Sequence, residues 1–318
     1  MNILVTGGAG FIGSHLIEKL LLRGDFVICV DNYDDLYNSS FKKENITKLS
    51  KNKNFVFYFN NILDIDSLKI IFNKYKIETI VHLAARAGVR KSIEDPKTCM
   101  DINITGTLNI LNLSRDFKVK NIIFASSSSV YGNCKKIPFS EEININEPIS
   151  PYAISKITGE LLCYTYNFLY KMNITCLRFF TVYGPRQRPD MAIHKFVKLI
   201  DNKCPITMFG DGSSSRDYTY ISDLVNAIIR SIDTCFNYEI INIGYGNPVR
   251  LDILIKIIEK KLGKKAIIIK KDIQKGDVNL TYADIKKAKK LLNYSPIISI
   301  EEGIEKFVNW YKKYKKKY

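Results

Sequence analysis

Long apolar runs are missing from this sequence. A membrane-spanning helix needs about 18 consecutive apolar residues, and the 318 residues contain no such run. The first residues, MNILVTGGAGFIG, have no basic segment ahead of an apolar one and do not resemble a secretory signal. We therefore expect no membrane association and a cytoplasmic location.

Histidine is scarce, and cysteine is not arranged in pairs. The chain has three histidines and seven cysteines, and no two cysteines have the CxxC spacing of zinc sites and redox motifs. Scattered cysteines are typical of unpaired thiols in a reducing compartment. We expect no metal site and no disulfide framework.

Acidic residues are fewer than basic ones, 32 against 48, which gives a formal net charge of +16. Such an excess can indicate nucleic-acid binding. The lysines, however, are spread along the whole chain. Their densest cluster, YKKYKKKY at 311–318, ends a predicted helix, where cations complement the helix dipole. We expect no nucleic-acid partner, and the charge favours anionic small molecules.

Apolar strands alternate with amphipathic helices through the first half of the chain. The predicted strands are 2–6, 26–30, 55–59, 79–83, 121–125 and 174–179, and the predicted helices are 11–23, 65–76, 98–116 and 151–171. Strands that are apolar throughout and alternate with helices indicate a parallel sheet covered on both faces. The predicted fold class is α/β, a Rossmann-type doubly wound sheet.

After about residue 180 the pattern changes to loops rich in proline and glycine. A strand at 239–244 follows, then helices at 251–262, 283–292 and 300–316. We expect a nucleotide-binding domain at 1–180, to which 219–243 returns. A smaller C-terminal substrate lobe would comprise 181–218 and 244–318.

A glycine turn joins the first strand to the first helix. In TGGAGFIG, Gly7, Gly10 and Gly13 allow a tight turn, close approach of the backbone to a pyrophosphate and close helix–strand packing. Asp31 ends the second strand, where a carboxylate binds ribose hydroxyls and repels a 2′-phosphate. The pattern predicts NAD, rather than NADP, as cofactor.

A tyrosine and a lysine are four residues apart in SPYAISK. Ser150 is a good N-cap and Pro151 suits the first helical position, so Tyr152 and Lys156 lie on one face of a helix. An ammonium beside a phenol favours the phenolate. The spacing alone leaves two readings open, an acid–base pair or ordinary surface packing.

Several motifs together resemble the extended short-chain dehydrogenase/reductase superfamily, and within it the nucleotide-sugar 4-epimerases. They are TGGAGFIG, HLAA (82–85), SSSSVYG (126–132), YAISK (152–156), RFFTVYGPRQRPD (178–190) and SRDYTYISD (215–223). The segment HLAARAGVRKS (82–92) is similar to the glucuronate 4-epimerases. The resemblance implies an NAD-binding Rossmann domain and a lobe that binds a UDP-sugar.

The resemblance also implies roles for individual residues. Tyr152 would be the base at the sugar 4-hydroxyl. Lys156 would hold the nicotinamide ribose and lower the tyrosine pKa, and Ser127 would bind the reacting oxygen. Cofactor contacts are implied for Gly7, Gly10, Phe11, Ile12, Gly13, Asp31, Asn32, Asn61, Ile62, Leu83, Ala84, Ala85 and Asn103. Substrate contacts are implied for Ser127, Ser128, Ser129, Thr181, Arg188, Arg216 and Asp277.

Other activities of the superfamily fit the motifs less well. A 4,6-dehydratase carries an Asp-Glu pair before VYG, where this chain has Ser128 and Ser129. A non-catalytic NAD sensor typically loses the tyrosine or the lysine, and both are present. The hydroxyl cluster with Thr181 and Arg188 favours UDP-glucuronate, interconverted with UDP-galacturonate, and UDP-glucose is the alternative substrate. The family also implies a homodimer through helices near 98–116 and 152–171.

Overall fold

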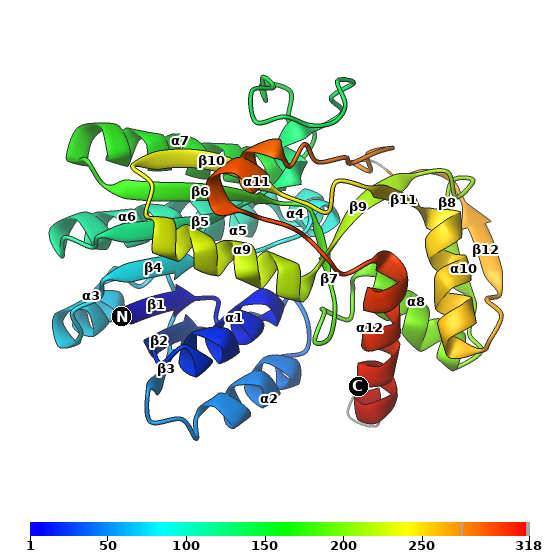
Figure 1. Cartoon of the computed structure of the whole chain (residues 1–318), viewed down its shortest axis with the longest axis horizontal. Helices are drawn as coiled ribbons and strands as arrows, with labels where there is room; N and C mark the ends of the chain where they lie inside the picture. Colours follow the sequence, from blue (N-terminus) through cyan, green and yellow to red (C-terminus); the bar gives the residue numbers. More distant parts are fainter. Residues whose placement is uncertain (275, 316–318) are drawn as a thin grey trace.

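Seven parallel strands form the central sheet of the computed structural model, which describes residues 1–274 and 276–315 (Figure 1). The strand order is β10-β6-β5-β4-β1-β2-β3. The strands are β1 (Asn2–Thr6), β2 (Phe26–Asp31), β3 (Phe55–Phe59), β4 (Thr79–His82), β5 (Asn121–Ser127), β6 (Asn173–Phe179) and β10 (Tyr238–Ile243). The predicted fold class is confirmed.

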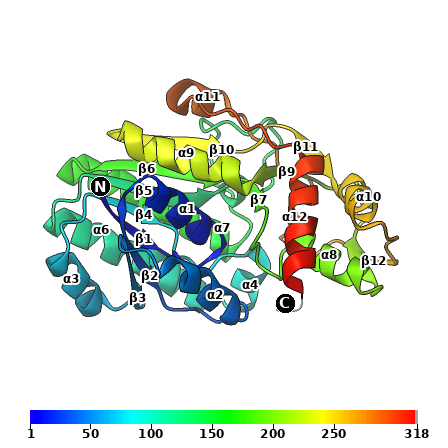
Figure 2. The same cartoon turned by 60° about the horizontal axis from the view of Figure 1, so that its bottom comes forward.

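Helices cover both faces of this sheet (Figures 1 and 2). One layer contains α1 (Phe11–Leu22), α2 (Ser40–Leu49) and α9 (Ile221–Thr234), and the other contains α3 (Ile65–Lys74), α6 (Gly106–Asp116) and α7 (Pro151–Tyr170). Strand β1 shows why both layers are needed. Ile3 and Val5 pack into the core on one face and Leu4 into the core on the other, and all three are fully buried.

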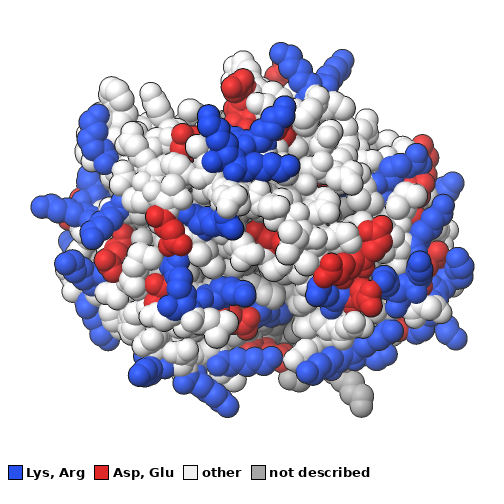
Figure 3. All heavy atoms as spheres, viewed as in Figure 1, with Lys and Arg blue, Asp and Glu red and all other residues white. Residues whose placement is uncertain are grey.

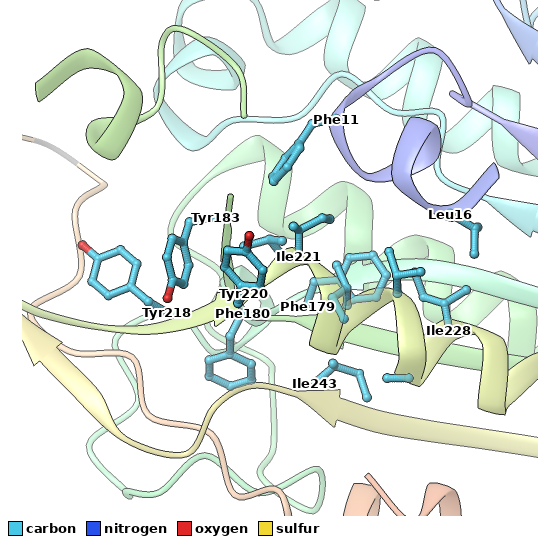
Figure 4. Packing of buried hydrophobic residues seen from close by; sticks show 14 of the residues in the cluster. Phe11, Leu16, Phe179, Phe180, Tyr183, Tyr218, Tyr220, Ile221, Ile228 and Ile243 are labelled. Atoms are coloured by element: carbon cyan, nitrogen blue, oxygen red, sulfur yellow. The ribbon is translucent and has the colours of Figure 1, made fainter. Parts of the chain in front are cut away.

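The C-terminal part of the chain adds two small sheets and four helices. Strands β7 (Thr181–Tyr183), β9 (Ser215–Tyr220) and β11 (Pro248–Arg250) form one sheet, and β8 (Ile206–Phe209) pairs with β12 (Ile268–Lys271). The helices are α8 (Ala192–Asp201), α10 (Leu251–Leu262), α11 (Lys286–Leu292) and α12 (Ile300–Tyr314). Aromatic side chains from the ends of β6, β7 and β9 join this part to the main core (Figure 4).

The sequence prediction missed several elements. Helices α2, α4 (Val89–Glu94), α8 and α9 were not predicted. The loops expected after residue 180 are present at 184–190 and 210–214, and α8 lies between them. The predicted helix 98–116 is interrupted. It consists of α5 (Pro96–Met100), a π-helical turn at Asp101–Thr105, and α6. Such a turn inserts one residue into the helical register, which sequence periodicity does not reveal.

The position of β10 bears on the expected domain division. This strand comes late in the sequence, yet it pairs with β6 in the central sheet, and α9 packs against α1. We therefore keep the division at 1–180 plus 219–243 as our proposal. The predicted helix 300–316 ends at Tyr314 in the structure, and residue 316 lies outside the described residues.

Charges of both signs share the face shown in Figure 3, where lysines and arginines lie among acidic side chains. None of the helices in the described ranges is both long and apolar enough to cross a bilayer. Within the same ranges, no three histidine, cysteine or acidic side chains are grouped as metal ligands would be. Each of the seven cysteines is a free thiol.

Candidate active site

The carboxyl ends of the central strands open into a cavity of about 350 Å³. Strand β1 lies between β2 and β4, so its glycine turn is flanked by the loops that follow those two strands. Most of the residues predicted from the sequence line this cavity: Gly7, Gly10, Phe11, Ile12, Gly13, Asp31, Asn32, Asn61, Ile62, Leu83, Ala84, Ala85, Ser127, Ser128, Ser129, Tyr152, Lys156, Thr181 and Arg188. The fold thus brings together segments that are far apart in the sequence.

The glycine turn forms a cradle that larger residues would fill. Gly7 has a φ of +68°, and a Cβ there would lie 2.7 Å from the backbone nitrogen of Ala84. Gly10 precedes α1, which begins at Phe11. The first N–H groups of a helix have no acceptor within it, and the helix dipole favours an anion there. These features fit the pyrophosphate of a dinucleotide.

Asp31 ends β2 beside this cradle. Its carboxylate accepts hydrogen bonds from the backbone nitrogens of Ala9 (3.1 Å) and Tyr33 (2.8 Å). The Lys42 ammonium lies 3.4 Å from Asp31 Oδ1 and also lines the cavity. Lys42 was not among the predicted site residues, because the helix that carries it, α2, was not predicted from the sequence. This lysine partly offsets the charge with which Asp31 would repel a 2′-phosphate.

The Tyr152–Lys156 pair lies on α7 as its spacing predicts. The Ser150 hydroxyl caps the helix by accepting from the Ala153 nitrogen at 3.1 Å. Lys156 Nζ donates to the Ala125 carbonyl at 2.7 Å and lies 5.8 Å from the centre of the Tyr152 ring. Both side chains line the cavity. The surface-packing alternative for this pair is therefore wrong.

The surroundings of Tyr152 act on its pKa in both directions. Burial raises the Tyr152 pKa, while a hydrogen bond with Ser127 and the charge of Arg188 act in the opposite direction. Lys156 is itself deeply buried, and loss of water around its ammonium lowers its pKa to about 8. The Lys156 ammonium donates a hydrogen bond to the Ala125 carbonyl.

A hydroxyl cluster faces Tyr152 across the cavity. Ser127 ends β5, and Ser128 and Ser129 begin the 3₁₀ turn that follows it. Ser127 Oγ accepts from the Ser129 nitrogen and lies 3.1 Å from Ser129 Oγ. Because the strand stops here, the turn presents three successive hydroxyl side chains beside the tyrosine.

Arg188 and Thr181 also line the cavity, and the charge of Arg188 acts on Tyr152. The Arg188 guanidinium donates to both carboxylate oxygens of Asp190, at 3.0 and 2.6 Å, and to the Ala87 carbonyl at 3.1 Å. Arg188 therefore adds N–H donors to the cavity lining, and its positive charge is paired with the Asp190 carboxylate.

A second cavity, of about 170 Å³, adjoins the first and shares Ser128, Ser129 and Thr181 with it. Both predicted nucleotide-side residues, Arg216 and Asp277, line it. Burial lowers the pKa of Arg216.

Arg90 was not among the predicted site residues, although it lies in the segment HLAARAGVRKS. Its guanidinium donates to Asp277 Oδ2 at 2.7 Å and stacks over the Phe209 ring at 4.8 Å. This contact joins α4 to the loop that carries Asp277. The second arginine of RAGVR was the sequence signal that could have identified it.

Asn103 does not line either cavity, unlike the other predicted cofactor residues. It lies in the π-helical turn, where its amide oxygen accepts from the Arg86 nitrogen at 2.7 Å and its amide nitrogen donates to Ser155 Oγ at 2.9 Å. Ser155 in turn donates to the Tyr152 carbonyl at 2.8 Å. Asn103 thus links the loop after β4 to α7, the helix that carries Tyr152 and Lys156.

A buried ion pair supports the hydroxyl cluster. Arg178 makes two hydrogen bonds to Glu160, at 2.9 and 2.8 Å, and both side chains are almost completely buried. Ser126 Oγ donates to Glu160 Oε1 at 2.5 Å, and Arg178 also donates to the Tyr131 hydroxyl at 2.9 Å. These bonds join α7, β6 and the end of β5 directly beside Ser127.

Known proteins are similar to this chain over nearly its whole length. The family described as "GDP-mannose 4,6 dehydratase" matches residues 4–307. A UDP-glucuronate 4-epimerase from Thermodesulfobacterium geofontis is 49% identical over 310 residues, which are 97% of this chain and 95% of that protein.

Two solved structures show the same overall fold. The UDP-glucuronic acid 4-epimerase of Bacillus cereus, in complex with UDP-glucuronic acid and NAD, has a TM-score of 0.93 and 39% identity, covering 98% of this chain and 99% of that one. The UDP-glucose 4-epimerase of Thermotoga maritima, with UDP-glucose, has a TM-score of 0.91 and 36% identity, with the same coverage. The chain therefore belongs to the NAD-dependent epimerase/dehydratase family of the extended short-chain dehydrogenase/reductase superfamily, and it resembles the UDP-glucuronate 4-epimerases.

Proposed function

We propose that the protein interconverts UDP-glucuronate and UDP-galacturonate by NAD-dependent epimerisation at C4. The broader class, an NAD-dependent UDP-sugar 4-epimerase, follows from its relatives. The observation that carries the finer assignment is the convergence of Tyr152, the serine cluster and a charge-paired Arg188 on one cavity. The adjoining cavity with Arg216 and Asp277 would take the nucleoside diphosphate.

The residues around C4 have distinct tasks in this mechanism. The glycine turn and Asp31 would hold NAD, which when bound would supply reversible hydride chemistry at C4. Tyr152 Oη takes the proton of the 4-hydroxyl and later returns it, and Ser127 Oγ holds the reacting oxygen by a hydrogen bond. The Ala125 carbonyl fixes the Lys156 ammonium beside the tyrosine ring. Since the same phenol serves both directions, Tyr152 need not exchange its proton with bulk water.

The cavity wall suits a carboxylate at C6 that must move during the reaction. Ser128, Ser129 and Thr181 offer hydroxyl donors, and hydrogen bonds to a charged acceptor contribute about 1.5–3 kcal/mol each. Arg188 is already paired with Asp190, so it attracts the uronate without adding a full unpaired charge. The sugar is bound by several moderate contacts and can turn to present its other face.

UDP-glucose is the alternative substrate, and the Thermotoga maritima relative supports it. The test is to compare kcat/KM for UDP-glucuronate and UDP-glucose on one preparation without added NAD, and then to repeat it with Thr181→Val. Our assignment expects a preference for the uronate and a selective loss of it in the variant. A preference of the unmodified protein for UDP-glucose would contradict the uronate assignment but not the epimerase class.

We further propose that two copies pair through the helices expected from the family, near 98–116 and 152–171. Helix α7, which covers the second of these ranges, leaves Ile154, Leu161, Tyr164 and Phe168 exposed at the three-, four- and seven-residue spacing of one helix face. Leu169 and Tyr170 are exposed near its C-terminal end. A contiguous apolar face of this kind is typical of a protein–protein interface. Light scattering coupled to gel filtration should give a dimer for the unmodified chain and a monomer for Phe168→Glu. We place the reaction in the cytoplasm, consistent with seven free thiols.

A further inference from the structure

The loop that follows β2 crosses the wall of the large cavity. Residues 32–39, called the strap below, line it with Asp34, Leu36 and Tyr37. Side chains fix the path of this loop. Asn32 Oδ1 accepts from the Asp34 nitrogen at 3.0 Å, and Asp34 Oδ1 accepts from the Leu36 nitrogen at 2.9 Å. The strap is therefore an ordered segment beside the cofactor cradle.

An ion pair connects the strap to the loop after β4. Arg86 Nη1 donates to both carboxylate oxygens of Asp34, at 3.1 and 2.9 Å, and to Asp35 Oδ1 at 3.0 Å. The Arg86 side chain is 19% exposed and that of Asp34 is 22% exposed. Water and salt screen a partly buried ion pair less than a pair that is fully exposed on the surface.

The order of the strands gives this ion pair its position. Strands β2 and β4 lie on either side of β1, so a bridge between their loops passes across the carboxyl end of β1, where the glycine turn lies. The Arg86 backbone is held in turn by Asn103, at 2.7 Å. Asn103 also donates to Ser155 on α7, so the Arg86 end of the ion pair is connected to the helix that carries Tyr152.

Tyr37 makes a second connection. Its ring contacts two cations, with Lys42 Nζ 5.5 Å and the Arg188 guanidinium 5.9 Å from its centre. Through Arg188, the strap also contacts the substrate end of the cavity. Two independent contacts therefore hold the strap closed.

We infer that the Arg86–Asp34 ion pair is a latch that retains NAD through many catalytic cycles. The inference rests on the proposed function, since it requires a dinucleotide bound by the glycine turn. A dinucleotide there would be covered by the strap, and it could leave only after the ion pair breaks. Arg86 is a positioning residue in this scheme, because it acts on the cofactor through the strap.

The experiment measures NAD retention directly. Asp34→Asn keeps the acceptor for the Leu36 nitrogen but removes the charge, and Arg86→Gln removes the other partner. Glu239→Gln is the matched control, because it breaks the part-buried Lys287–Glu239 pair, whose residues do not line the cavity. NAD content after gel filtration and the NAD dissociation rate into an excess of a scavenging dehydrogenase are measured for each variant.

We expect each latch variant to release NAD at least about tenfold faster than the unmodified protein. The double variant should release NAD no faster than Arg86→Gln alone, because that single change already removes the contacts to both Asp34 and Asp35. Salt should speed release from the unmodified protein more than from the variants, and Glu239→Gln should behave as the unmodified protein. Equal release rates in all proteins would overturn the latch, whereas unmodified protein that neither co-purifies with NAD nor binds it would contradict the proposed function itself.

Discussion

Removing the charge of Glu160 should destabilise the protein strongly. Glu160→Gln keeps the size of the side chain but leaves the Arg178 guanidinium without a counter-charge, and the two side chains are only 4% and 2% exposed. Breaking a buried pair by removing one partner typically costs about 3–5 kcal/mol. For a large domain each kcal/mol lowers Tm by roughly 2–4 °C, so we expect a decrease of roughly 6–20 °C. Differential scanning fluorimetry measures this.

Two controls separate burial from charge. Glu239→Gln neutralises a carboxylate whose pair is about one-third exposed, and it should change Tm little. The double variant Glu160→Met, Arg178→Met removes both buried charges and should be more stable than Glu160→Gln alone. If the Tm of Glu160→Gln lies within about 1 °C of the Tm of the unmodified protein, the reasoning that the pair is fully desolvated is refuted.

Further predictions concern the site. Tyr152→Phe should lower turnover by at least about 10²-fold while NAD and UDP-sugar still bind, and epimerisation at a normal rate would show that Tyr152 is not the base. Asp31→Ala should weaken NAD binding and relax discrimination against NADP, measured by fluorescence titration, and NADP co-purifying with the unmodified protein would contradict the NAD assignment. The Lys156 pKa is about 8 in the folded protein against 10.5 for a free lysine. The unfolded chain therefore binds more protons between these values, and urea titrations should show the free energy of unfolding rising with pH there, relative to Lys156→Met. Arg186 makes two hydrogen bonds to Glu18 on α1, at 3.0 and 2.6 Å, so Arg186→Met should raise KM for the UDP-sugar more than it lowers kcat, because the Arg188 loop loses its anchor.

Local patterns in the sequence were sufficient for the strands of the main sheet, the glycine turn and the start of α7. The strands are apolar on both faces, and the glycine turn, the capped start of α7 and the Tyr152–Lys156 spacing all depend on residues close together in the chain. For such features the physical cause is local: backbone freedom at glycine, a cap for free N–H groups, and the helical repeat. The resemblance to a known family then identified residues such as Arg216 and Asp277, which line the second cavity as expected.

Only the tertiary structure decided which charges meet. Arg86 and Asp34 are 52 residues apart, and Arg90 and Asp277 are 187 apart. No periodicity relates such positions; strand order and loop paths bring them together. The π-helical turn likewise turns Asn103 toward Arg86 and Ser155, which a regular helix would not predict. The direction of the Tyr152 pKa also depends on the fold, because burial outweighs the nearby groups that favour the phenolate. The sequence by itself thus determined the chemistry available at the site, and the packing of distant segments determined how those groups are paired, buried and held.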